Sequence, residues 1–447
     1  MSKTTFSNWL GNVVSEVTEI LRPTSVQQLQ DMVGKETGRL LVFGSKMSKT
    51  PILGARAGKA IDTSGLDQIL ELGADYVVAQ AGITLYELSR ALYAQGRQLP
   101  GFTITVNPSI GGCITAPTKG VNQPFRPGAN SVSSAIDWVT LVKPSGERVQ
   151  LHARADEAEL ALLKDSYGTI GVVAEARLQT VPLVSAEVQE EIVPLQPFLH
   201  DASALARGIE NRVLLLPKLG CGMVRNHRDV RVEAPSRPYE QVIGDPTHPY
   251  VSLATRLPRW ARKAILKPAV RIGVDRKPQR KLHIENLTLY PAKEKFFLDF
   301  IQWSVPTRDL ASLLPEIIDF CSAHPDFPPE SLVELIRINP ESRFFDSDDR
   351  VAVDPVCFDR HAGARWERFY RDYNGFMVQR RASPYLNQTR FLDPGDLRHI
   401  YGDRYEAWRG AIFAADPERK FGSTYLDHVL DLQSLPAART QPATAQG

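Results

Sequence analysis

NPSIGGCITAPTKG, from Asn107 to Gly120, decides the fold, because it makes sense only beside two other glycine-bearing turns. One is VFGSKMS at Val42–Ser48, and the other is SYGTIGVV at Ser166–Val173. Each is flanked by β-branched residues, as expected where a strand turns sharply beside a ligand. Glycine permits positive φ and lets backbone N–H groups approach an anion without a Cβ in the way. Three such turns predict one long anionic cofactor that lies across several loops.

The composition describes a soluble globular protein with more than one core. A chain of 447 residues exceeds one ordinary core, so two domains are expected. The net charge of +2 argues against nucleic-acid binding, which usually needs a strongly basic domain. The cysteines form no CxxC pair, which predicts buried free thiols in a reducing compartment and no metal site. They are Cys113, Cys221, Cys321 and Cys357.

The chain shows no targeting or membrane-spanning pattern. Its N-terminus, MSKTTFSNWLGNVVSEV, has no apolar run of signal-peptide length. No later stretch reaches the ~18 apolar residues that a spanning helix requires. We therefore expect a cytoplasmic protein that acts on a small molecule, and the oligomeric state stays open.

Residues 22–183 are predicted to alternate short strands and helices. SVQQLQDMVGK at Ser25–Lys35 has helical spacing behind a serine or threonine cap. A second helix begins at Thr84, with Glu87 three residues on, which is the pattern of a capping box. The alternation at Ala135–Leu151 predicts a hairpin around a Pro-Ser-Gly turn.

The rest of the chain has a different pattern. Strands at Phe300–Val305 and Ser331–Ile338 alternate with a helix at Arg308–His324, which favours an α+β domain. We expect an α+β fold with a cofactor-binding domain at 1–183 and a substrate cap at 184–392. A helical segment at 393–435 and a disordered tail at 436–447 complete this division.

These segments together resemble the FAD-binding domain of the vanillyl-alcohol-oxidase family, also called PCMH-type. The family order is a glycine turn, an "IDTSGL" strand end, a "GxTLxEL" helix start, an "LP…GG" loop and a late "GxxGVV" turn. This chain has the first turn, then IDTSGL at Ile61–Leu66, GITLYEL at Gly82–Leu88, Leu99-Pro100, Ile110–Gly112 and Gly168–Val173. The resemblance implies a two-domain fold with bound FAD.

The later segments are similar to the branch that holds aldonolactone oxidases and decaprenylphosphoryl-ribose oxidases. The similarity lies in ENLTLYP at Glu285–Pro291, FIQWSVPT at Phe300–Thr307 and SLVELIRI at Ser331–Ile338. In such proteins the middle of the chain caps the flavin, and the C-terminal segment returns to the FAD domain.

The FAD pyrophosphate must be met by N–H donors, and the glycine turns are predicted to supply them. Hydroxyl groups in the same turns can add donors. The predicted cofactor-binding residues are Gly44, Ser45, Lys46, Met47 and Ser48 in the first turn, Pro108, Gly111, Gly112, Thr115 and Gly120 in the second, and Gly168, Gly171 and Val173 in the third.

Two departures from the family pattern concern the link to flavin. Many relatives carry a histidine in the first turn that bonds covalently to the flavin, and here the aligned residue is Met47. Many carry "HG" in the second loop, where this chain has Lys119-Gly120. We therefore expect noncovalent FAD. Lys119 either places a positive charge beside the reduced flavin or faces solvent.

Oxidation of a carbinol requires loss of the O–H proton and transfer of a hydride to flavin N5. The resembled branch often has a lysine near the end of the cap, but this chain reads YLNQTR there, at Tyr385–Arg390. Asn387 and Gln388 can orient a hydroxyl but are poor bases, which leaves the proton acceptor open. Arg337 and Gln302 match substrate-site positions in relatives.

Two charged residues of one predicted strand compete for the substrate side. Glu334 lies three positions from Arg337, so a regular strand directs the two to opposite faces. We favour Arg337 as the residue that faces substrate.

A basic segment runs from Arg256 to Lys281, with ten Lys/Arg and one acidic residue, Asp275. Apolar residues such as Trp260 and Ile265 are interleaved with the charges. One interpretation is a peripheral contact with anionic lipid or an anionic substrate, and the other is a solvated cap loop.

The sequence thus predicts an FAD-dependent oxidoreductase that oxidises a hydroxyl carbon of a sugar, aldonolactone, polyol or sugar-like conjugate. The missing lysine keeps two alternatives open. One is a flavin-dependent tailoring or C=C-reducing enzyme on an apolar substrate, and the other is a noncatalytic FAD-binding protein.

Overall fold

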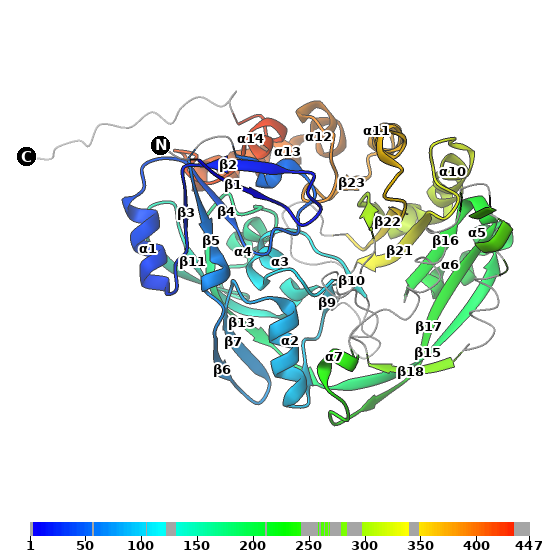
Figure 1. Cartoon of the computed structure of the whole chain (residues 1–447), viewed down its shortest axis with the longest axis horizontal. Coiled ribbons are helices and arrows are strands. Elements are labelled where there is room, and N and C mark those ends of the chain that lie inside the picture. The colour runs from blue at the N-terminus through cyan, green and yellow to red at the C-terminus, as the bar shows by residue number, and fades with distance from the viewer. Residues whose placement is uncertain are drawn as a thin grey trace, which may run out of the picture.

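The computed structural model describes residues 3–432, except for 56–57, 104, 122–130, 211, 243–257, 259–260, 263, 267, 269–278, 284–296 and 339–347. The expected disordered tail, the ENLTLYP segment and most of the basic segment at 256–281 lie outside the described residues. Two groups of strands and helices lie side by side, and α12, α13 and α14 lie close to the N-terminal strands β1 and β2 (Figure 1).

The N-terminal part is built on a three-stranded parallel sheet, in the order β3–β5–β4, and a five-stranded antiparallel sheet, in the order β12–β11–β13–β7–β6. Apolar side chains from both sheets and from α2 and α3 form the core between them. The elements are β1 Thr4–Ser7, β2 Val14–Val17, β3 Glu19–Leu21, α1 Val26–Lys35, β4 Leu40–Phe43, β5 Lys59–Asp62, β6 Ile69–Leu72, β7 Tyr76–Gln80, α2 Leu85–Ala94, β8 Arg97–Gln98, β9 Phe102–Thr103, α3 Ile110–Thr115, β10 Gly120–Val121, β11 Ile136–Val142, β12 Arg148–His152, α4 Glu157–Lys164, β13 Val172–Gln179 and β14 Val181–Pro182.

The local signals in this part are mostly confirmed. Helix α1 begins after Ser25, whose hydroxyl accepts from the Gln28 N–H at 3.2 Å. The Thr84 hydroxyl likewise accepts from the Glu87 N–H, which starts α2. The Glu87 carboxylate meets the Thr84 hydroxyl rather than the backbone N–H, so the predicted capping box is only half formed. The hairpin is confirmed as β11 and β12.

A nine-stranded sheet dominates the second part, with the path β18–β15–β17–β16–β21–β22–β20–β23 and with β19 paired to β22. Most of its helices cover one face of the sheet, whereas the short helix α7 packs against α2 of the N-terminal part (Figure 1). The elements are β15 Val184–Pro194, α5 Leu195–His200, α6 Ala202–Ile209, β16 Arg212–Leu216, β17 Cys221–Val232, α7 Tyr239–Val242, β18 Gln279–His283, β19 Asp299–Phe300, β20 Trp303–Pro306, α10 Leu310–Ala323, β21 Leu332–Ile338, β22 Arg350–Cys357, α11 Gly363–Gln379 and β23 Ser383–Pro384.

The two faces of this sheet have different neighbours. Val333 and Leu335 of β21 join the core that contains helix residues of α5, α6, α10 and α11, so we call this the helix-covered face. Because side chains alternate along a strand, Glu334 points to the opposite side. Its carboxylate meets Lys119, which precedes β10, so this second side faces the N-terminal part. We call it the inner face.

The strand expected at Phe300–Val305 is two short strands with a break at Gln302. The Gln302 carbonyl accepts hydrogen bonds from the Tyr385 N–H and the Thr389 hydroxyl. These bonds take the place of the sheet ladder at this point, which is why the strand is interrupted.

The C-terminal helices α12 Pro394–Tyr401, α13 Asp403–Ala415 and α14 Thr424–Val429 pack on the N-terminal part. The indole N–H of Trp408 donates to the Asp165 carbonyl at 3.2 Å, and the Leu40 N–H donates to the Lys420 carbonyl at 2.7 Å. These contacts bring the end of the described chain back to its beginning.

The four cysteines are buried, and Cys113, Cys321 and Cys357 are free thiols, as predicted. Burial raises the pKa of the Cys113 thiol to about 12. Within the described residues, no helix is long and apolar enough to cross a membrane. The same residues contain no group of three or more histidine, cysteine or acidic side chains that could hold a metal ion.

Candidate cofactor and active site

The three glycine turns meet in space. The Ser45 hydroxyl of the first turn accepts from the Ser109 N–H of the second at 2.9 Å. A Cβ on Gly44 would overlap the Ser109 hydroxyl, so only glycine allows this approach. The Thr115 carbonyl, at the end of α3, accepts from the Tyr167 N–H of the third turn at 2.8 Å. One ligand can therefore touch all three turns.

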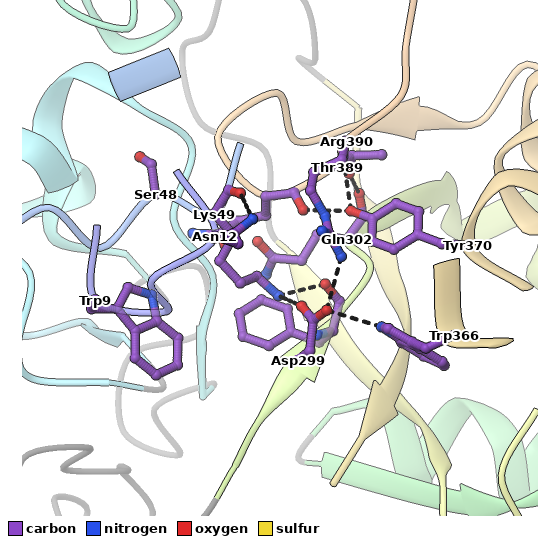
Figure 2. Close-up of polar contacts among 12 residues, drawn as sticks. Trp9, Asn12, Ser48, Lys49, Asp299, Gln302, Trp366, Tyr370, Thr389 and Arg390 are labelled. Carbon is purple, nitrogen blue, oxygen red and sulfur yellow. Dashed lines mark hydrogen bonds and ion pairs between the residues drawn. The ribbon is translucent and has the colours of Figure 1, made fainter. Parts of the chain in front are cut away.

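The first turn has the form of an anion-binding nest. Its carbonyls face the N-terminal hairpin: those of Lys46 and Met47 accept from the backbone and indole N–H groups of Trp9, at 3.2 and 3.0 Å. Lys46 is left-handed, with φ 56°. The N–H groups of residues 45–48 donate to no other described residue. Because Trp9 binds these carbonyls, the N–H groups on the other side of the turn are available as donors to the oxygens of a pyrophosphate. Figure 2 shows Trp9 beside this turn.

The second loop contributes fewer N–H donors than the sequence predicted. The Gly111 N–H donates to the Ala81 carbonyl at 2.8 Å, so it is not available to an anion. The Thr115 hydroxyl donates to the Gly111 carbonyl at 3.1 Å. Gly112 is exposed, and its N–H has only a 3.4 Å contact with the Ser109 hydroxyl. The predicted nest of three residues is thus reduced to Gly112, because α3 packs against the end of β7.

Other residues of the second loop hold its position. The Pro108 carbonyl accepts from the N–H of Leu85 at 2.9 Å. Gly120 pairs with Thr103 between β10 and β9.

The third turn contains two glycines with different surroundings. Gly171 has φ 155°, and a Cβ there would lie 2.7 Å from the Val142 carbonyl. Gly168 has φ 79° and no described atom within 4 Å of an added Cβ. Val173 is buried in β13 opposite Leu141. Close packing therefore explains Gly171, whereas Gly168 faces open space.

Lys119 does not face solvent, which corrects one of its two predicted roles, and its charge is balanced by carboxylates. Its ammonium donates to Glu334 at 2.7 Å and to Asp354, and only 5% of its side chain is exposed. Glu334 also binds Arg212 at 2.7 Å. Burial opposes the Lys119 charge, but Asp354 and Glu334 outweigh it and raise the pKa of Lys119. We call these four residues the Lys119 cluster.

The two carboxylates of the Lys119 cluster have different pKa values. Burial raises the pKa of Asp354 to about 6 in spite of Lys119. Burial also disfavours the Glu334 carboxylate, but Lys119 and Arg212 lower its pKa to about 2. At neutral pH the cluster holds two cations and two carboxylates.

Arg337 lies on the helix-covered face, and the prediction that it lines the substrate side is wrong. It binds Asp349 at 2.8 Å and also Glu210, the residue that ends α6. The sequence argument correctly separated Glu334 from Arg337. It chose the wrong one because the sequence does not say which face the helices cover.

The Gln302 backbone lies close to the segment that carries Asn387 and Gln388, and contact of these three residues with substrate stays a prediction. The Asn387 carbonyl accepts from the Lys49 N–H at 3.0 Å, and its amide nitrogen approaches the Pro117 carbonyl at 3.5 Å. The Gln388 carbonyl accepts from the Tyr370 hydroxyl at 2.7 Å. Several buried side-chain oxygens here have no hydrogen-bond partner among the described residues. They are Asn107 Oδ1, Thr118 Oγ1, Asn387 Oδ1 and Gln388 Oε1.

Sequence reasoning missed a fully buried charge of the region, Lys49. Its ammonium donates to Asp299 Oδ1 at 2.9 Å (Figure 2). The same ammonium lies over the ring of Phe300. Burial lowers the pKa of Lys49 to about 8, although Asp299 opposes this shift. The available signal was a lysine directly after an anion-binding turn. Its partner, 250 residues further on, had no sequence signal.

These features fit FAD. A pyrophosphate needs several N–H donors from tight turns, and residues 45–48 supply them without a competing acceptor. A flavin ring and a hydroxylated substrate need polar partners, and unpaired oxygens lie near the junction of the second loop and residues 387–388. The residues present are therefore suited to the cofactor that the sequence predicted.

The comparisons with known proteins define the class first. Residues 18–152 match FAD_binding_4, described as an FAD binding domain. Residues 18–152 of this chain thus match a PCMH-type FAD-binding domain, the cofactor domain that the sequence predicted.

Particular relatives follow. L-gulono-1,4-lactone dehydrogenase of Mycobacterium tuberculosis is 23% identical over 441 residues, which cover 95% of this chain and 99% of that protein. D-arabinono-1,4-lactone oxidase of Eremothecium gossypii is 28% identical over 205 residues, which cover 44% and 38%. The chain is thus a distant homologue of aldonolactone oxidases and dehydrogenases.

Solved structures support the same fold. A solvent-stable cholesterol oxidase matches with a TM-score of 0.71 and 17% identity over 96% of this chain and 97% of that one. The predicted α+β fold of the vanillyl-alcohol-oxidase type is therefore confirmed over nearly the whole chain.

Proposed function

We propose that this chain oxidises a hydroxyl carbon of a sugar, aldonolactone, polyol or sugar-like conjugate, with FAD bound noncovalently. The observation that carries the proposal is the first turn, where four successive N–H groups have no acceptor among the described residues while Trp9 holds the carbonyls of Lys46 and Met47. Met47, which cannot form a bond to flavin, supports the noncovalent mode.

Each part of the site has a separate task. The N–H groups of residues 45–48 bind the pyrophosphate, with Gly112 beside them. Bound FAD supplies the hydride acceptor at N5. The amide oxygens of Asn387 and Gln388 accept a hydrogen bond from the substrate hydroxyl and orient it. The buried charges of the Lys119 cluster fix the second loop against the inner face of the cap sheet.

The substrate class rests on the relatives and on the polar lining. Proteins named for gulonolactone, arabinonolactone and galactonolactone match the chain. Unpaired amide and hydroxyl oxygens would remain unsatisfied against a purely apolar substrate, at a cost of about 1–3 kcal/mol each. This favours a hydroxylated substrate over a sterol.

The test is anaerobic reduction of the bound flavin. L-gulono-1,4-lactone, L-galactono-1,4-lactone, D-arabinono-1,4-lactone, simple polyols and cholesterol are each mixed with the flavin-loaded protein, and the visible absorbance is followed. At least one hydroxylated compound should bleach the flavin. Bleaching by cholesterol alone, or by dithionite alone, would contradict the proposal.

A further inference from the structure

A buried group of three charges connects the first glycine turn to the cap. Lys49 donates to Asp299 Oδ1 at 2.9 Å, and Arg390 donates to Asp299 Oδ2 at 3.0 Å (Figure 2). The Trp366 indole also donates to Oδ2, at 3.0 Å. Side-chain exposure is 1% for Lys49, 4% for Asp299 and 18% for Arg390. We call Lys49, Asp299 and Arg390 the Lys49 triad.

The Lys49 triad is not electrically balanced. It holds two cations and one carboxylate, so its net charge is +1 when all three groups are ionised. The neighbouring Lys119 cluster, by contrast, holds two cations against two carboxylates. Of the two buried lysines of the site, only Lys49 therefore belongs to a group with surplus charge.

The Lys49 triad lies next to the predicted cofactor-binding turns, so its net positive charge can act on a bound cofactor. Lys49 follows directly on the four N–H groups of the nest, and its own N–H binds the Asn387 carbonyl. Asn387 in turn reaches Pro117 in the second loop. The triad therefore lies where the first turn, the second loop and the C-terminal segment meet. An uncompensated buried charge is costly, and its field is screened less than in water.

We propose that the Lys49 triad stabilises the negative charge that the bound flavin takes up on reduction. In the balanced reaction, the carbinol C–H gives a hydride to FAD and the O–H proton leaves to solvent. The products are the carbonyl compound, the anion FADH⁻ and one proton. Lys49 and Arg390 act as positioning residues that make this anion more stable. The inference rests on the FAD-binding part of the proposed function and needs no knowledge of the substrate.

Sulfite titration provides the test, because sulfite adds to oxidised flavin and leaves a negative charge on the ring. Lys49→Met removes the surplus charge and leaves Asp299 paired with Arg390. Sulfite affinity should fall on the order of tenfold, from Coulomb's law at an effective dielectric constant of about 20 and a separation on the order of 10 Å. The flavin midpoint potential should fall in parallel, by about 30 mV for each tenfold in a two-electron couple.

Matched variants test whether sulfite affinity depends on the positive charge of Lys49. Lys49→Arg keeps the charge and should restore sulfite affinity. Lys143→Met removes a lysine whose ion pair with Glu147 is exposed, and it should leave sulfite binding and potential unchanged.

The possible results distinguish a failure of the Lys49 triad proposal from a failure of the proposed function. Wild-type sulfite affinity and potential in Lys49→Met would overturn the inference. If Lys49→Met fails to fold, Arg390→Gln removes the same surplus and should shift both quantities in the same direction. Loss of oxidised FAD from both variants would show that the triad holds the resting cofactor, which also overturns the inference. Wild-type protein that binds no flavin would instead refute the proposed function.

Discussion

Removing the ammonium of Lys119 should destabilise the fold because it leaves the buried carboxylate of Asp354 without its cation. Glu334 keeps its bond to Arg212 at 2.7 Å when Lys119 is replaced by methionine. Among the described residues, the fully buried Asp354 then keeps only the hydrogen bond from the Trp303 N–H, at 3.2 Å. Breaking a buried ion pair by removing one partner typically costs about 3–5 kcal/mol, because the other charge stays buried without compensation. Lys119→Met should lower the free energy of unfolding by that amount at neutral pH.

The pH dependence gives a second readout of the same variant. The folded-state pKa of Asp354 is about 6, above the ordinary value of 3.8, because burial disfavours the charge. Lys119 lowers this pKa, so its removal should raise it further. A raised carboxyl pKa favours the folded state as pH falls through that pKa, because the folded protein then binds the extra proton. The deficit of Lys119→Met should therefore shrink as pH falls from the higher pKa of Asp354 in the variant to about 6, and it should change little below that pH.

Urea denaturation of the wild type and variants measures both effects. The double variant Lys119→Met/Asp354→Asn removes the stranded charge and should recover much of the lost stability. Lys143→Met, which breaks an exposed pair, should change the free energy of unfolding by less than about 1 kcal/mol. A free energy of unfolding for Lys119→Met within about 1 kcal/mol of the wild-type value would show that Lys119 does not stabilise the fold through Asp354. So would a difference from the wild type that grows on acidification.

Two further predictions concern the turns and the cap. Gly44→Ala and Gly112→Asp should each abolish FAD retention, the first because its methyl group would overlap the Ser109 hydroxyl and the second because it adds negative charge beside the nest; normal flavin content in either, measured after gel filtration, would place the cofactor elsewhere. Arg337→Ala should keep its flavin and its kcat/KM for whichever compound reduces the flavin, because Arg337 lies on the helix-covered face. A tenfold loss of kcat/KM in that variant would show that this face contacts substrate.

Local signals in the sequence predicted local structure well. The caps of α1 and α2 and the hairpin β11–β12 follow from residues close in sequence, so pattern alone indicated them. The three glycine turns and their order predicted the FAD-binding fold for the same reason. Positive φ at Gly168 and Gly171 is a property of the turn itself.

Contacts between distant segments were not predictable in this way. Lys49 and Asp299 are 250 residues apart, and no periodicity connects them. The choice between Arg337 and Glu334 depended on which face of β21 the helices cover, and that is decided by packing. The break at Gln302 likewise depends on Tyr385 and Thr389. The domain boundaries and the cytoplasmic location stay predictions.

The central claim is that this chain binds FAD noncovalently through its glycine turns. Acid precipitation of the flavin-loaded protein, followed by identification of the flavin in the supernatant, tests it most directly. We expect intact FAD in the supernatant, equimolar with the polypeptide, and a colourless pellet. Flavin that stays with the pellet, or no flavin even after FAD is added to the purified protein, would contradict it.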